Sequence, residues 1–218
     1  VDILPGETED DAEARSFEMG AARAKELNES GHPCYDIPMG GASIVGSVGF
    51  ASGYVEFEKQ VQAMNLKVDY IFHATGTGGT MAGLAAGRKM AQSDTKIISV
   101  TVSPKDEKYL CKVEKLANDV LALVKSPEKV DRSEDLHMDT GYYAPGYEQP
   151  NEAASEAIRL LARTEGLFVD PVYTGKALAG LIDYVRSGKV PQGSNVVFWH
   201  TGGATALFAE REILGKLY

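Results

Sequence analysis

The chain has 218 residues, 44% of them hydrophobic, and a formal net charge of −9 at pH 7. This length predicts one large domain or one and a half ordinary ones, with a sizeable core. The acidic balance, without a long basic run, argues against DNA or RNA as a partner. No apolar run approaches the roughly 18 residues of a membrane span, and the N-terminus does not resemble a signal peptide. We therefore expect a soluble, cytoplasmic protein with no membrane partner.

The cysteines and histidines form no pattern typical of a disulfide framework or a metal site. Cys34 and Cys111 lie far apart in the sequence and have no CxxC spacing, so we expect free thiols. The four histidines lack the HxxxH and HExxH spacings of local metal motifs; they are His32, His73, His137 and His200. The sequence therefore predicts no metal site.

Hydrophobic periodicity predicts alternating helices and strands in the first part of the chain. Apolar residues at helical spacing indicate helices, and short apolar runs bounded by turns indicate buried strands. We expect helices over residues 10–30, 45–64, 81–90 and 106–124, and extended segments over residues 34–37, 68–74 and 96–102. The small residues of the second helix, Gly46, Gly49, Ser52 and Gly53, predict close packing against a neighbour.

A polar stretch over residues 126–150, which contains three prolines, predicts an irregular connection of about 25 residues, and loops of that length are often functional or mobile. After it we expect helices over residues 152–164 and 176–186, strands over 167–169 and 195–200, and a closing helical stretch. Alternating strands and helices predict an α/β fold, with an open, twisted, mostly parallel sheet covered by helices on both faces.

Open parallel sheets bind ligands at the carboxyl ends of their strands, and the first such end here is a glycine-rich turn at residues 75–80. Bare amides before a helix form a cradle for an anion. The turn departs from the dinucleotide fingerprint, because Met81 stands where the third glycine belongs, and it lacks the Gly-Lys-Ser/Thr of a P-loop. It predicts a phosphate ligand that is neither ATP nor NAD; the alternative is a simple tight turn.

Two further strand ends contribute hydroxyl groups. Tyr173 is a candidate for proton transfer or ring stacking, and Thr201 is a candidate hydrogen-bond partner for a ligand heteroatom. The structural alternatives are a core tyrosine and a helix-capping threonine. His73 and His200 end their strands, and we expect them to pack or to bond the backbone rather than to catalyse.

Taken together and in order, four strings resemble one enzyme family; they cover residues 37–41, 75–84, 170–177 and 200–203. The chain resembles the D-cysteine desulfhydrase and 1-aminocyclopropane-1-carboxylate (ACC) deaminase family of pyridoxal-phosphate (PLP) enzymes, which have the tryptophan-synthase-β type fold. The resemblance spans essentially the whole chain and corresponds to the C-terminal two-thirds of such an enzyme. It implies that residues 66–218 form the large PLP-binding domain, and that residues 1–65 are the remainder of the smaller domain and the crossover.

The resemblance also implies roles for individual residues, with PLP as the cofactor. Tyr173 would transfer protons at the substrate, and Tyr147 would face the substrate or the ring from the long connection. A neutral hydroxyl from Thr201 at the pyridine nitrogen would leave that nitrogen largely unprotonated, which suits β-elimination. The implied cofactor-binding residues are Gly76, Thr77, Gly78, Gly79 and Thr80 at the phosphate, with Thr174, Thr201 and Gly202.

Thr174 stands where the ACC deaminases carry glutamate, which favours the desulfhydrase branch. The resemblance therefore implies a carbon–sulfur lyase that converts D-cysteine to pyruvate, hydrogen sulfide and ammonia. The turn at residues 73–76 is also similar to that of L-cysteate sulfo-lyases, which release sulfite. L-cysteate therefore remains an alternative substrate. Opening of the cyclopropane ring is disfavoured.

The chain departs from the family in one respect. The Asn-Lys-x-Arg-Lys segment with the Schiff-base lysine and the Ser-Asn-His loop are absent, and Lys176 is no replacement because it belongs to the matched Tyr-Thr-Gly-Lys string. We hypothesise that the N-terminal part is missing or is a separate fragment that carries the lysine. The resemblance suggests a homodimer. A non-catalytic module that binds a phosphate ligand is the alternative from another class.

Overall fold

The computed structural model describes residues 9–149 and 151–209, and the chain forms two compact units divided between Gly41 and Ala42. The first unit contains α1 (Glu9–Glu29) and the short helix η1 (Met39–Gly41). After α1, the side-chain carbonyl of Asn28 accepts a hydrogen bond of 3.0 Å from the Cys34 amide. The expected extended segment at residues 34–37 belongs to no strand. A domain boundary at residue 65 stays a prediction.

The second unit is built on a four-stranded sheet in the order β3-β2-β1-β4, and every pairing in it is parallel. Phe72 at its centre pairs with Ile98 on one side and with Phe198 on the other. The strands are β1 (Tyr70–Thr75), β2 (Lys96–Thr101), β3 (His137–Asp139) and β4 (Val196–Phe198). The predicted α/β class with a parallel sheet is confirmed.

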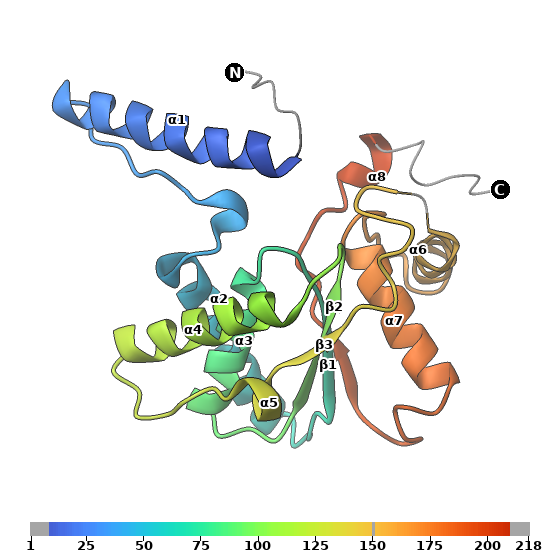
Figure 1. The fold of residues 1–218 in the computed structure, drawn as a ribbon. Coiled ribbons are helices and arrows are strands. Elements are labelled where there is room, and N and C mark those ends of the chain that lie inside the picture. The colour runs from blue at the N-terminus through green and yellow to red at the C-terminus, as the bar shows by residue number, and fades with distance from the viewer. Residues whose placement is uncertain (1–8, 150, 210–218) are drawn as a thin grey trace. The chain divides into compact units, whose positions relative to one another are not determined.

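Helices cover both faces of this sheet (Figure 1). On one face Ile71 of β1 packs in a cluster with Tyr54 and Leu84, whereas the next residue, Phe72, packs on the other face with Ala177. Successive side chains of a strand point to opposite faces, so both faces need a cover. The helices of this unit are α2 (Ile44–Ala63), α3 (Gly79–Met90), α4 (Glu107–Leu123), α5 (Arg132–Asp135), α6 (Glu152–Glu165), α7 (Thr174–Arg186) and α8 (Ala206–Ala209).

The expected irregular connection at residues 126–150 contains two regular elements, so that prediction is wrong in part. Asp131 accepts hydrogen bonds from the amides of Ser133 and Glu134 and so begins α5, and β3 extends the sheet beyond β2. Elements of four and three residues are too short to show a hydrophobic period.

The strand expected at residues 167–169 is also absent. Val169 is fully buried in a cluster with Ala157 of α6 and Leu178 of α7. The carbonyl of Phe168 accepts a hydrogen bond of 2.8 Å from the His200 ring. The apolar run therefore contributes to the core through its side chains and does not join the ladder.

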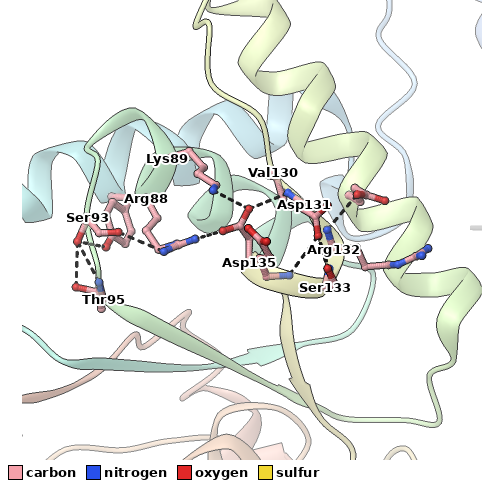
Figure 2. Close-up of polar contacts among 12 residues, drawn as sticks. Arg88, Lys89, Ser93, Thr95, Val130, Asp131, Arg132, Ser133 and Asp135 are labelled. Carbon is pink, nitrogen blue, oxygen red and sulfur yellow. Dashed lines mark hydrogen bonds and ion pairs between the residues drawn. The ribbon is translucent and has the colours of Figure 1, made fainter.

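A buried carboxylate fastens α5 to the end of α3, as Figure 2 shows. Asp135 is only 5% exposed. It pairs with the Arg88 guanidinium and, at 2.9 Å, with Lys89 Nζ, and it accepts a hydrogen bond of 2.7 Å from the Asp131 amide. Because a buried charge needs partners of this kind, the network fixes the chain just before β3.

Helices α2 and α3 approach so closely that only a glycine fits between them. A Cβ built on Gly83 of α3 would lie 2.3 Å from the Ser47 carbonyl oxygen of α2. The close packing predicted for α2 therefore exists, but the glycines that permit it, Gly83 and Gly87, lie on α3. By contrast, a Cβ on Gly49 of α2 has no atom within 4 Å.

We expect Gly83→Ala to destabilise the fold by about 3 kcal/mol, because the added methyl group forces α2 and α3 apart. Gly49→Ala is the matched control, and it is expected to stabilise α2 by about 0.5–1 kcal/mol through helix propensity. Urea unfolding followed by circular dichroism measures both changes. Equal effects of the two substitutions would contradict the proposed helix contact.

Candidate functional site

Three predicted ligand-binding segments come together at the carboxyl edge of the sheet. The Trp199 amide donates a hydrogen bond of 2.8 Å to the Phe72 carbonyl, so the ends of β1 and β4 lie side by side. A Cβ built on Gly76 would be 3.5 Å from Tyr173 Cε1, and one built on Gly203 would be 2.8 Å from Asp170 Oδ1. The turns after β1 and β4 therefore both contact the loop before α7.

The turn between β1 and α3 has the properties of an anion cradle. Gly78, at φ 97°, caps α3 without a side-chain hydrogen bond. Within residues 9–149 and 151–209 no hydrogen bond from the five amides of residues 76–80 to a protein acceptor is found. The 12-residue helix behind them adds the positive end of its dipole. Gly76, Thr77 and Thr80 are half-buried, and Gly78 and Gly79 are buried. The residues fit a phosphate group.

Ser47 adds a polar atom beside this cradle that the sequence did not reveal. Its hydroxyl is buried and makes no hydrogen bond to any described residue. It lies 3.6 Å from a Cβ built on Gly79. A buried hydroxyl without a hydrogen-bond acceptor destabilises the fold. An anion bound at the adjacent turn would accept a hydrogen bond from Ser47. A serine in the first turn of a helix has no sequence signal that separates this role from packing.

The loop before α7 is organised by one carboxylate. Asp170, only 1% exposed, accepts hydrogen bonds from the amides of Val172, Tyr173 and Thr174 at 2.9, 2.7 and 2.8 Å. Charge-assisted bonds of this kind are stronger than neutral ones, and a carboxylate at a helix N-terminus is also favoured by the helix dipole. Asp170 therefore fixes the backbone from which the Tyr173 side chain projects.

Thr174, expected at the cofactor, lies inside this loop. Its side chain is 1% exposed. The hydroxyl donates to the Asp170 carboxylate and accepts a hydrogen bond of 2.9 Å from the Asp170 amide. Both of its bonds hold the loop, and a contact with the cofactor stays a prediction.

The structure brings together the two tyrosines predicted as catalytic. The hydroxyl groups of Tyr147 and Tyr173 are hydrogen-bonded. Their ring centroids are 5.8 Å apart with an interplanar angle of 76°, an edge-to-face arrangement that aromatic rings prefer. Each residue remains more than one-third exposed, and Tyr173 lies beside the glycine turn at Gly76. Their catalytic role itself stays a prediction.

Thr201 and Gly202 lie in an exposed turn after β4. The Gly202 amide donates a hydrogen bond of 3.0 Å to His200 Nδ1, while His200 Nε2 bonds the Phe168 carbonyl. As expected, His200 bonds the backbone. Its ring shapes the turn that carries Thr201, whose predicted contact with the pyridine nitrogen stays a prediction.

Two polar pairs join β1 to neighbouring elements before the glycine turn. Tyr109 and Thr75 share a hydrogen bond of 2.8 Å between their hydroxyls, and burial raises the pKa of Tyr109 to about 12. His73 is fully buried; its Nδ1 donates to the Ala74 carbonyl at 2.9 Å, and its Nε2 accepts from the Ser99 hydroxyl at 2.7 Å. Desolvation lowers the pKa of His73 to about 4, so the ring is neutral and structural, as expected. In the part of the chain that the structure describes, no cluster of His, Cys, Asp or Glu could hold a metal ion.

These features agree with the comparison to known families. Residues 7–202 match the pyridoxal-phosphate dependent enzyme family, and the chain belongs to that family. Its cofactor is pyridoxal phosphate, and the glycine turn has the groups that would hold the phosphate. Among curated relatives, the D-cysteine desulfhydrases of Salmonella newport (strain SL254) and Salmonella heidelberg (strain SL476) are each 35% identical over 209 residues. The alignments cover 96% of this chain and 60% of each relative.

A solved structure described as an ACC deaminase homologue has a TM-score of 0.79 and 30% sequence identity, over 96% of this chain and 61% of that one. The processed form of threonine deaminase isoform 2 from Solanum lycopersicum has a TM-score of 0.53 at 19% identity, over 97% of this chain and 56% of that one, which shows the shared fold alone. The expected family resemblance is confirmed. The chain spans about 60% of the length of the curated relatives it matches.

The buried His73 predicts a loss of stability in mild acid. Its pKa is about 4 in the folded chain and about 6.5 in the unfolded chain. Between pH 6.5 and pH 4, His73 is therefore protonated in the unfolded chain but neutral in the folded chain. The contribution of His73 to the free energy of unfolding therefore falls by roughly 3 kcal/mol between pH 6.5 and pH 4. Urea unfolding at several pH values measures it. His73→Gln is expected to remove this part of the slope and the exposed His32→Gln to leave it; an unchanged slope in His73→Gln would refute the assignment.

Proposed function

We propose that this chain is the cofactor-binding part of a carbon–sulfur lyase that converts D-cysteine and water to pyruvate, hydrogen sulfide and ammonia. The observation that carries the proposal is the hydrogen-bonded pair of hydroxyls, Tyr147 and Tyr173, next to a phosphate cradle. The curated relatives named D-cysteine desulfhydrase support the choice of substrate. In this proposal residues 66–218 belong to the large domain and the Schiff-base lysine comes from residues outside this chain.

In this proposal, residues at the strand ends would hold the cofactor. The amides of residues 76–80 would bind the phosphate, and Thr201 and Gly202, exposed beyond β4, would face the ring. When bound, PLP supplies an electron sink for the negative charge that develops at the substrate α-carbon. Tyr173, in contact with Gly76, lies near enough to the cradle to act on a substrate held there.

The tyrosine pair is the group that moves protons. One phenol donates to the other, so a proton held at one oxygen can be passed on when the second oxygen gives or receives one at the substrate. Asp170 sets the backbone of Tyr173, and the ring contact with Tyr147 keeps its ring in place.

Thr174 is the residue that separates the candidate reactions. The threonine hydroxyl is hydrogen-bonded to Asp170. Because this residue is a threonine, the position offers no carboxylate of the kind that the ACC deaminases carry after the tyrosine. This favours elimination of a sulfur leaving group over opening of a cyclopropane ring. L-cysteate, with sulfite as leaving group, is the alternative substrate, and a non-catalytic module that binds a phosphate ligand is the alternative class.

A substrate panel tests the proposal. The complete protein, loaded with PLP, is incubated with D-cysteine, L-cysteate and ACC, and pyruvate, ketobutyrate, sulfide and sulfite are measured. We expect pyruvate and sulfide from D-cysteine. Sulfite from L-cysteate alone, or ketobutyrate from ACC alone, would replace the proposed substrate. A protein that develops no visible PLP absorbance and forms no product would favour the binding module.

Tyr173→Phe is expected to lower kcat for D-cysteine by roughly 10²- to 10⁴-fold, the usual effect of a lost acid–base group. PLP affinity, measured by titration of its absorbance, is expected to stay nearly the same, because the cradle is formed by backbone amides. Tyr35→Phe, which removes the hydroxyl of a tyrosine that is 66% exposed, is the control. Turnover at the parent rate in Tyr173→Phe would remove this hydroxyl from the mechanism.

A further inference from the structure

Lys176 is a buried cation to which the proposed function gives no role. It lies in the first turn of α7, three residues after Tyr173, and its side chain has no exposed surface. Nζ donates hydrogen bonds to the backbone carbonyls of Gly146 at 2.7 Å and Tyr143 at 3.2 Å. Both carbonyls belong to the loop that leads to Tyr147. A lysine is rarely buried unless its charge is used, so this arrangement calls for a reason.

The bond to Gly146 bears directly on Tyr147. The Gly146 carbonyl and the Tyr147 amide belong to the same planar peptide unit, so a donor fixed on that oxygen fixes the plane from which Tyr147 starts. The bond to Tyr143 holds the other end of the same turn. Asn151 steadies the turn from outside, donating to the carbonyls of Tyr142 and Ala144 at 3.1 and 2.6 Å.

Asp170 holds the backbone of Tyr173, and Lys176 holds the backbone just before Tyr147. Asp170 binds the amide of Tyr173 at 2.7 Å, and Lys176 binds the turn before Tyr147. Both charges are buried, and no ion pair within 4.0 Å joins them in the described part of the chain. Burial lowers the pKa of Lys176 and the nearby Asp170 carboxylate opposes that shift. The hydrogen bonds of Lys176 go to backbone carbonyls, and those of Asp170 go to the loop before α7.

We propose that Lys176 is a positioning residue: by holding the turn at residues 143–146, it places the hydroxyl of Tyr147 on that of Tyr173. The effect on turnover rests on the proposed function, whereas the effect on the loop does not. The two are therefore measured separately.

Limited proteolysis with chymotrypsin measures the loop, because Tyr142, Tyr143 and Tyr147 are themselves cleavage sites. In the complete PLP-loaded protein, Lys176→Met is expected to raise the cleavage rate at these tyrosines by about tenfold or more, because release of the turn raises its open population. Lys112→Met removes an exposed lysine of α4 and is expected to change nothing. Lys176→Gln keeps N–H donors on a shorter, neutral side chain, and an intermediate rate is expected; it also covers the case in which Lys176→Met does not fold. A folded variant of either kind that resists chymotrypsin like the parent overturns the proposal.

Chemical rescue separates the ammonium group from simple packing. In Lys176→Ala, added propylammonium can refill the vacated space and donate to the same carbonyls. We expect it to restore resistance to chymotrypsin, whereas neutral 1-propanol is expected to restore little. Equal rescue by both compounds would mean that the side chain acts by volume alone, which contradicts the proposal.

Kinetics test whether Lys176 acts through Tyr147. We expect Lys176→Met to lower kcat for D-cysteine roughly tenfold to hundredfold. The further loss caused by Tyr147→Phe is expected to be much smaller in Lys176→Met than in the parent, since coupled residues are not additive. Fully additive losses would refute the coupling. If the parent forms no pyruvate, the proposed function fails, and the chymotrypsin comparison still decides the role of Lys176.

Discussion

The carboxylate of Asp170 is the group on which the arrangement at the sheet edge depends. It binds three successive amides and the Thr174 hydroxyl, and it also contacts the turn after β4 at Gly203. A single buried charge thus defines the start of α7 and the direction of Tyr173, and it lies against the turn after β4. Loss of this charge would leave three amides and one hydroxyl without their acceptor, which is more costly than the loss of any one contact at the edge.

The parallel sheet explains why these groups can meet. Every strand pairing runs in the same direction, so the turns after β1 and β4 leave from one edge, and the helices behind them point their N-termini toward it. This is the arrangement in which open α/β sheets bind ligands. In this member of the PLP-dependent enzyme family, it brings the unpaired amides of the glycine turn and the hydroxyl of Tyr173 to the same edge.

The sequence predicted most of the secondary structure, because long helices and buried strands have a clear hydrophobic period. It failed where elements are short, as for α5 and β3, and where an apolar run packs without pairing, as at residues 167–169. The site was predicted in the same uneven way. The glycine turn and the two tyrosines carry motifs, but contacts between distant segments do not. The hydrogen bond from Lys176 to the Gly146 carbonyl and the position of the unpaired Ser47 hydroxyl beside Gly79 depend on packing that no local pattern encodes.

The tyrosine pair and the glycine turn belong to different helices. Tyr173 begins α7, and Tyr147 is tied to the same helix through Lys176, whereas the glycine turn begins α3 on the opposite face of the sheet. Both tyrosines are therefore anchored to α7, and the packing of α7 against β1 and β2 contributes to their distance from the glycine turn. A larger side chain where α7 faces the sheet, at Ala177 or Gly180, would therefore move the tyrosine pair relative to the glycine turn without changing either tyrosine.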